Sequence, residues 1–256
     1  MENSHLIGLS RQMSLQRELE VVANNVANLN TTGFKADGAL FEEYIMPTAR
    51  ANQFRGNDQQ LSYVRDRATW LDFSNGPTRQ TGNSLDIALD GDAFLVVQTP
   101  RGERYTRNGA FQLNAQGQLV TASGDTVMGE GGPIQFQPND KGISISATGT
   151  ISVKEGDQIE DSVRGKLRLV NFPRRQQLQK DGTGLFAVPN NQQPQPVVEG
   201  SARVMQGTLE QSNVSPILEM ARMIEVSRSY TQVANMLQQQ SDQRRSSIEK
   251  LADIAA

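Results

Sequence analysis

The chain has 256 residues, a net charge of −3 at pH 7, no cysteine and a single histidine. This length allows one or two domains with a buried core, and the slightly acidic charge does not favour binding to nucleic acid or to an anionic membrane. The absence of cysteine excludes disulfides and thiolate metal sites, and one histidine, His5, is too few for a histidine-based zinc site; a Ser–His triad is not indicated either.

The first residues show no export signal of the cleaved type. Residues 1–5 have neither the basic region nor the apolar stretch of a secretory signal. No apolar run approaches the roughly 18 residues of a spanning helix. We therefore expect a protein that is cytoplasmic or that leaves the cell by a route without a cleaved signal.

Residues 4–30 are predicted to form a helix with two apolar faces. The first face is a seam for one partner helix, because its residues recur at steps of four and three: Leu15, Leu19, Val22, Val26 and Leu29. Leu6, Leu9 and Met13 form a second stripe on the roughly opposite side. The helix is either a core helix packed from two sides or one packed among several neighbours in an assembly. Gly33 is the expected left-handed stop.

Residues 216–255 are predicted to form a second helix. Ser215 is the expected N-cap, followed by Pro216 and by Glu219 in the first turn. A seven-residue apolar period indicates a supercoiled seam, made of Met223, Val226, Tyr230, Val233 and Leu237. Polar residues then interrupt this seam, which suits several helices meeting around a tube. The polar stretch 238–247 is either the wall of a channel or a solvated helix face.

The middle of the chain indicates β-structure. Residues 36–80 have few regular signals and are expected to be an extended connecting segment, with a polar stretch at 52–60. From about residue 84, alternating apolar residues and glycine turns predict strands. The expected fold class is α+β, in which N- and C-terminal helices form a coiled-coil layer around an inserted, mainly antiparallel β-domain. The expected domains are residues 1–35 with 210–256, then the connection 36–80, and the β-rich outer domain 81–209.

The sequence contains no convincing catalytic constellation. Asp86, Asp90 and Asp92 could bind a hard cation, but their spacing is not that of an EF-hand loop and carboxylates at turns explain them better. The glycine-rich segment 129–133 lacks the ending of a phosphate-binding loop. No carboxylate pair indicates a glycosidase. We expect no enzyme activity, cofactor or metal; the alternative is a secreted β-domain enzyme or sugar-binding module whose helices dimerise it.

Three blocks of sequence resemble the flagellar rod and hook family. The first is residues 23–35, Ala-Asn-Asn-Val-Ala-Asn-Leu-Asn-Thr-Thr-Gly-Phe-Lys. The second runs from Gly91-Asp92-Ala93-Phe94 through Tyr105-Thr106-Arg107-Asn108-Gly109 to Gly124, and the third from Val204-Met205-Gln206-Gly207 to Arg228-Ser229-Tyr230. Because the chain is short, the resemblance is to rod rather than hook subunits. It is most like the proximal-rod members, with the distal-rod members as the alternative.

This resemblance implies a structural subunit of the basal-body rod in the periplasm. It implies export through the flagellar type III apparatus, helical polymerisation, transmission of torque and enclosure of the export channel. The implied partners are other copies of the chain, neighbouring rod proteins, the export apparatus and the surrounding rings, without nucleic acid or membrane insertion. We assign to the assembly interface the seam residues of both helices, together with Asn25, Asn28, Gly33 and Phe34 from the first block.

Overall fold

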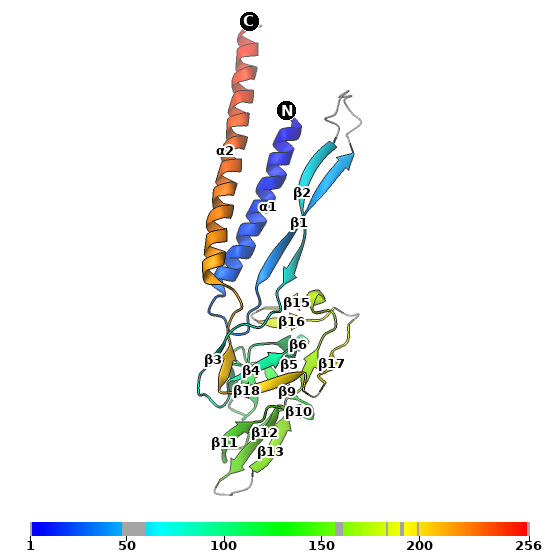
Figure 1. Ribbon diagram of the computed structural model, residues 1–256, viewed down its shortest axis with the longest axis vertical. Helices are drawn as coiled ribbons and strands as arrows, with labels where there is room; N and C mark the ends of the chain where they lie inside the picture. The colour runs from blue at the N-terminus through cyan, green and yellow to red at the C-terminus, as the bar shows by residue number, and fades with distance from the viewer. Residues whose placement is uncertain are drawn as a thin grey trace. The chain divides into compact units, whose positions relative to one another are not determined.

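The computed structural model describes residues 2–47, 60–156, 161–182, 184–189, 192–198 and 200–254 (Figure 1). The chain forms two compact units. The helical unit consists of Met1–Ala27, Asp37–Asp72 and Ser215–Ala256, and the β-unit of Asn28–Ala36 and Phe73–Val214. The chain therefore passes between the units four times. An N-terminal helix, a mainly antiparallel β-rich middle and a C-terminal helix agree with the coarse fold prediction.

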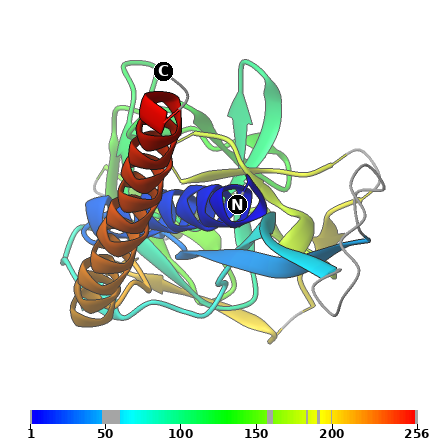
Figure 2. The ribbon, with the colours of Figure 1, turned by 90° about the horizontal axis from the view of Figure 1, so that it is seen from above.

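The helical unit contains helix α1 (Glu2–Ala27), helix α2 (Pro216–Ile254) and a two-stranded antiparallel hairpin. Helix α1 contacts both α2 and the hairpin. The two helices are inclined to each other, as the view along the long axis shows (Figure 2). Proline occupies the first position of α2 and Glu219 its first turn, as favourable helix starts do. The observed helices match the predicted spans to within three residues.

The hairpin was not predicted from the sequence. Strands β1 (Asp37–Pro47) and β2 (Gln60–Leu71) lie where an extended connection was expected, and their pairing is irregular between Leu40 and Phe41. Most of the described side chains of β2 are exposed, so the strand lacks the alternation of a half-buried sheet. Of the polar stretch 52–60, residues 52–59 lie outside the described part of the chain.

Within its described residues, the β-unit contains seventeen short strands and one 3₁₀ turn. The strands are β3 (Thr78–Gln80), β4 (Ile87–Gly91), β5 (Phe94–Thr99), β6 (Gly102–Thr106), β7 (Phe111–Leu113), β8 (Leu119–Thr121), β9 (Thr126–Gly129), β10 (Gly132–Pro133), β11 (Asp140–Ile145), β12 (Thr150–Glu155), β13 (Asp161–Lys166), β14 (Leu169–Asn171), β15 (Gln179–Lys180), β16 (Leu185–Ala187), β17 (Gln195–Pro196), β18 (Ala202–Gln206) and β19 (Thr208–Glu210). The 3₁₀ turn η1 spans Arg175–Gln177.

Antiparallel pairing joins these strands into one large sheet and three small ones. The large sheet has the order β15-β16-β6-β5-β9-β8-β7, with β10, β14 and β17 attached beside it. The small sheets are β11-β12-β13, β18-β4 and β19-β3. The last two pairs bring the end of the β-unit back to its beginning, because β18 and β19 follow residue 200 while β3 and β4 precede residue 92.

The core of the β-unit contains a mainly aliphatic cluster and a separate group of contacting aromatic rings. Buried residues of the large sheet, of β12 and of β4 and β18 form one apolar cluster, which includes Val97, Ile151 and Leu167. Aromatic rings form a second group, in which Phe94 contacts Phe73, Phe172 and Phe186 at centroid distances of 5.6–5.8 Å. Such edge-on ring contacts add specific geometry to the burial of apolar area.

Candidate functional site

The predicted seam of α2 is the least exposed side of that helix. Val226, Val233 and Leu237 are buried, and Met223 and Tyr230 are half-buried. On the N-terminal segment, Val22 is buried, and the remaining seam residues Leu15, Leu19, Val26 and Leu29 are half-buried. Within one chain, therefore, the two seams are the protected faces of their helices.

Two contacts fix the register of the helix pair. Arg222 Nη2 donates to Glu18 Oε1 at 2.8 Å, and a Cβ placed on Gly8 would lie 2.6 Å from Leu237 Cδ2. The helices are thus antiparallel, with Gly8 level with Leu237 and Glu18 level with Arg222. Gly8 continues the seam one heptad before Leu15, and its missing side chain leaves room for Leu237.

Asn25 hydrogen-bonds the end of helix α1 to the start of the hairpin. Its side-chain oxygen accepts a hydrogen bond from Asp37 N, and its amide nitrogen donates to Asp37 O, both at 2.9 Å. Asn25 is buried, and this pair of bonds satisfies both ends of its amide. The residue holds the start of β1 against the end of α1.

Asn28, Gly33 and Phe34 belong to the β-unit. Thr31 Oγ1 donates to Asn28 Oδ1 at 3.0 Å. Gly33 has φ 67°, and a Cβ there would lie 2.6 Å from the carbonyl carbon of Arg107. Only glycine combines this conformation with such a close backbone approach. The ring of Phe34 is buried beneath Lys180, whose Nζ lies 4.0 Å from the ring centroid.

A buried ion cluster joins the three sequence blocks inside the β-unit. Lys35, Arg107 and Glu210 are 1%, 3% and 2% exposed. Lys35 Nζ donates to Glu210 Oε1 at 2.7 Å, and Arg107 Nε donates to Glu210 Oε2 at 3.0 Å. The guanidinium also donates to the carbonyls of Gly91 and Ala93. Charges removed from water persist only when they are paired and hydrogen-bonded in this way.

The cluster lies where the chain passes in and out of the β-unit. Lys35 Nζ donates to Ser74 O at 2.7 Å, and Gly76 N donates to Glu210 Oε1 at 3.0 Å. Asn213 bonds both Ala36 N and Ser74 Oγ. Segments 33–36, 74–76 and 210–213 are therefore held together by side chains from all three. Three of the four passages between the units, at residues 36–37, 72–73 and 214–215, lie within two residues of these segments.

Sequence reasoning missed the cluster residues and Gly8. Lys35, Arg107 and Glu210 stand within the quoted blocks, but their partners lie 103 and 175 residues apart along the chain. Each block contains at least one charged side chain, but the second and third blocks contain others, so the sequence does not single out these three. Gly8 was detectable as the position one heptad before Leu15 and two before Val22.

Several apolar side chains of the helical unit are exposed. On α1 these are Leu6, Leu9 and Met13, the predicted second stripe. On α2 they include Ile217, Leu218, Met220 and Ile224. Contiguous exposed apolar patches are a feature of surfaces that contact other proteins.

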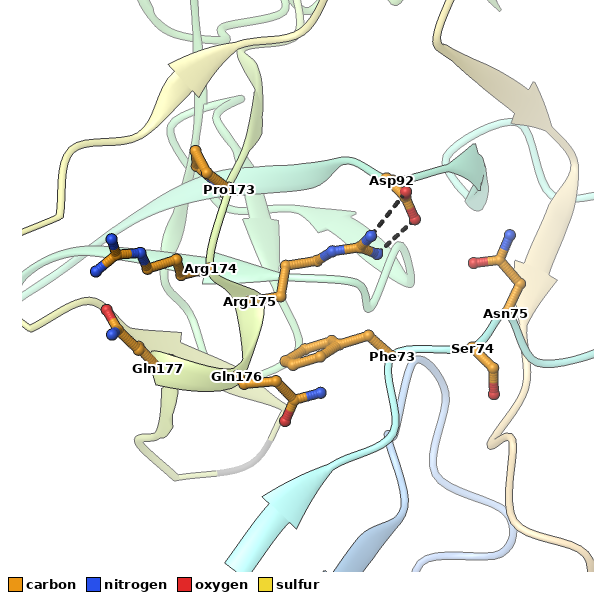
Figure 3. A pocket seen from close by; sticks show the side chains of 9 residues that line it. All are labelled: Phe73, Ser74, Asn75, Asp92, Pro173, Arg174, Arg175, Gln176 and Gln177. Carbon is orange, nitrogen blue, oxygen red and sulfur yellow. Dashed lines mark hydrogen bonds and ion pairs between the residues drawn. The ribbon is translucent and has the colours of Figure 1, made fainter.

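A hollow of about 740 Å³ in the β-unit is polar (Figure 3). Its one lining carboxylate, Asp92, is bonded to the guanidinium of Arg175, with Nη2 and Oδ2 at 2.8 Å. The remaining polar groups are the guanidinium of Arg174 and uncharged amides and hydroxyls. This arrangement offers no nucleophile beside a base.

Among the described residues, no three His, Cys, Asp or Glu side chains are grouped in a way that could hold a metal ion. Asp86 accepts a hydrogen bond from Asn83, and Asp92 pairs with Arg175. No described helix is long and apolar enough to cross a membrane.

The shifted pKa values in the β-unit belong to ion pairs and to one buried tyrosine. Hydrogen bonds from Arg164, at 2.6 and 2.7 Å, lower the pKa of Asp140. A hydrogen bond from Arg104 likewise lowers the pKa of Asp181. Burial raises the pKa of Tyr105. Each group has a structural partner or packing role, and none is a candidate catalytic acid or base.

Known families match three parts of the chain. Residues 6–35 match "Flagella basal body rod protein", residues 88–153 match "Flagellar hook protein FlgE/F/G D1 domain", and residues 205–250 match "Flagellar basal body rod FlgEFG protein C-terminal". The ion cluster draws one residue from each matched segment or its flank: Lys35, Arg107 and Glu210.

Comparison with whole proteins of known families points to the same family. The flagellar basal-body rod protein FlgF of Caulobacter vibrioides is 38% identical over 99% of this chain and 100% of its own length. FlgF of Mesorhizobium japonicum is 34% identical over 93% of both chains. The rod protein FlgG of Buchnera aphidicola subsp. Baizongia pistaciae is 34% identical over 84% of this chain and 86% of its own.

Proposed function

This chain belongs to the flagellar basal-body rod protein family and is a structural subunit of the rod; we propose that its place is the proximal rod, in the periplasm. The FlgF relatives support this position, because the similarity to the Caulobacter protein covers 99% of the chain, whereas that to the Buchnera FlgG covers 84%. A distal-rod position is the alternative within the same family.

We propose that the terminal helices form a coiled-coil layer with those of neighbouring subunits. The observation that carries this proposal is the apolar surface left on both helices after they have packed on each other: Leu6, Leu9, Met13, Ile217, Met220 and Ile224 are all exposed. Neighbouring copies and other rod proteins would cover these side chains. Copies related by a rotation and a rise make contacts that do not close, so the product is a helical shaft that transmits torque.

The polar end of α2 suits the wall of an export channel. The described side chains of residues 241–250 are all exposed and mostly polar. A passing unfolded chain would be retained by a strongly apolar wall or by a wall with charge of one sign. Before assembly, the subunit would travel unfolded through the export apparatus, and the basal-body rings would surround it afterwards.

The helix pair on which the proposed layer is built can be tested by placing a charge in the seam. Leu237→Asp removes a buried side chain at a cost of about 2–5 kcal/mol and adds an unpaired carboxylate. Its matched control is Gln238→Asp, one residue away on an exposed side of the helix. We expect Leu237→Asp to abolish swimming in a strain that depends on this chain, and the control to swim.

The fold of the β-unit provides the second readout. Hydrogen exchange of β5 and β9 should be unchanged in Leu237→Asp, because the substitution lies in the helical unit. Normal swimming of this variant would contradict the proposed helical layer. Loss of protection in the β-unit would mean that the seam stabilises the whole chain rather than the assembly.

A secreted β-domain enzyme or sugar-binding module is the rival class. The polar hollow lined by Arg174 and Arg175 is the feature it would have to use. Full-length similarity to structural rod proteins favours the rod subunit instead.

A further inference from the structure

Two exposed apolar stripes lie on the helical unit, one on each helix. The α1 stripe is Leu6, Leu9 and Met13, and the α2 stripe is Ile217, Met220 and Ile224; these side chains are between 43% and 81% exposed. At 100° per residue, each stripe falls on the side of its helix away from the seam. The pairing of α1 with α2 inside one chain therefore leaves both stripes open.

The stripes match each other in length and in spacing. Each has three apolar residues spread over two turns, with steps of three and four residues. In an antiparallel helix pair one stripe is read forwards and the other backwards. Ile217 then lies opposite Met13, Met220 opposite Leu9, and Ile224 opposite Leu6. The central pair, Met220 and Leu9, is out of register with the two outer pairs by only one residue.

The stripes cannot meet within one chain. The register set by Gly8 with Leu237 and Glu18 with Arg222 puts Met220 about ten to fifteen residues away from the level of Leu9. Both stripes also face away from the seam. The contact therefore requires two chains that are offset along the helix axis, by about 20 Å at 1.5 Å per residue.

We propose that the α1 stripe of one copy packs on the α2 stripe of a second copy that is displaced by this distance. The proposal rests on the proposed function, because copies related by a rotation and a rise keep α1 of one antiparallel to α2 of the next. A second copy is the indicated occupant, since one chain carries both matching stripes. Each copy then uses both stripes, one on either side, so that the contact repeats without closing.

The stripes end at polar residues. Arg17 and Glu20 follow on α1, and Arg228 and Thr231 follow on α2, all exposed. The contact is thus limited to three side chains on each copy, far fewer than the roughly 20–30 residues per side of a stable interface. It is weak alone and forms together with the other contacts of the assembled rod.

Disulfide trapping can test the register, because the chain has no cysteine of its own. The test variant is Leu9→Cys with Met220→Cys, expressed in a strain that depends on this chain and oxidised in swimming cells. The control is Leu9→Cys with Asn235→Cys. Residue 235 lies five turns beyond Ile217 on the same exposed face of α2. It therefore faces the same side of the helix as the stripe but lies too far along the helix axis to contact Leu9 of the other copy.

We expect a ladder of disulfide-linked copies for the test pair and only single chains for the control. A disulfide requires Cα atoms about 4.4–6.8 Å apart, and the proposed offset leaves residue 235 of one copy roughly 20 Å from residue 9 of the other. Swimming cells with no links in the test pair, or with equal links in the control, would overturn the proposed register. They would leave the assignment as a rod subunit intact.

Opposite charges give a second test if the cysteine pair impairs swimming. Leu9→Glu alone and Met220→Lys alone should each reduce the swimming radius, and the double variant should recover at least part of it. A double variant no better than either single variant would overturn the contact. Disulfide links from Leu9→Cys to a cysteine introduced into a different rod protein, without links between copies of the test pair, would also overturn it.

Discussion

Replacing Glu210 by glutamine tests whether the buried ion cluster stabilises the β-unit. The carboxylate accepts hydrogen bonds at both oxygens: Lys35 Nζ and Gly76 N at Oε1, and Arg107 Nε at Oε2. A glutamine has one acceptor oxygen and one NH₂ group. In either orientation the NH₂ group faces a donor, and Arg107 loses the carboxylate that it binds.

The expected cost is large compared with the stability of a domain. Removing one partner of a buried ion pair costs about 3–5 kcal/mol, because the remaining charge stays buried without compensation. Folded domains are stable by only about 5–15 kcal/mol in total. We therefore expect Glu210→Gln to lower the urea midpoint of the β-unit strongly and to weaken hydrogen-exchange protection in β4 and β5.

Two further variants separate burial from charge. Glu130→Gln removes an exposed ion pair with Lys166 in the same unit, for which about 0–1 kcal/mol is expected. Lys35→Met should cost less than Glu210→Gln, because Glu210 keeps Arg107 and Gly76, and Ser74 O still accepts from Asn213. A midpoint for Glu210→Gln equal to that of Glu130→Gln would refute the stabilising role of the cluster.

Three other substitutions give independent checks. Gly33→Ala and Gly82→Ala each place a side chain at positive φ, at a cost of about 1–3 kcal/mol. Gly33→Ala should destabilise the β-unit more in urea unfolding, because only Gly33 has backbone atoms near its Cβ position. Gly8→Val should raise hydrogen exchange in α1 and the contacted part of α2 by displacing Leu237, whereas Gln16→Val on an exposed side of α1 should not. Arg164 lowers the pKa of Asp140, so the stabilisation is present above the unfolded pKa of about 3.9 and is lost as pH falls through the lower folded value. The β11-β12-β13 sheet should therefore lose hydrogen-exchange protection at acid pH in the wild type, and this pH dependence should shrink in Arg164→Gln.

The helices could be predicted from the sequence because each combines a strong local period with clear end signals. The seam of α2 recurs every seven residues and begins after Pro216, and both features depend only on neighbouring residues. The strands around Phe94 and Phe111 were predictable for the same reason, from alternation and glycine turns. The β1–β2 hairpin was not, because exposed strands such as β2 leave no apolar alternation to detect.

The ion cluster could not be predicted from the sequence, since its geometry exists only after folding. Lys35 and Glu210 are 175 residues apart, and β18 and β19 must pair with β4 and β3 before Glu210 can approach Arg107. Taken singly, a lysine, an arginine and a glutamate in polar loops are expected to be solvated. Burial of all three is decided by the topology of the β-unit.

The ion cluster places a physical requirement on three residues that lie within the segments matched by the family models. Each block supplies one charged residue, and loss of Glu210 would leave Lys35 and Arg107 buried without the carboxylate that they share. Gly33 adds a steric requirement at the same place, because its Cβ position is occupied by the backbone of Arg107. An exposed helix face has no such requirement, since many apolar side chains of similar size can fill a packed stripe. The residues of the ion cluster and Gly33 should therefore tolerate fewer substitutions than the surfaces by which we propose that copies assemble.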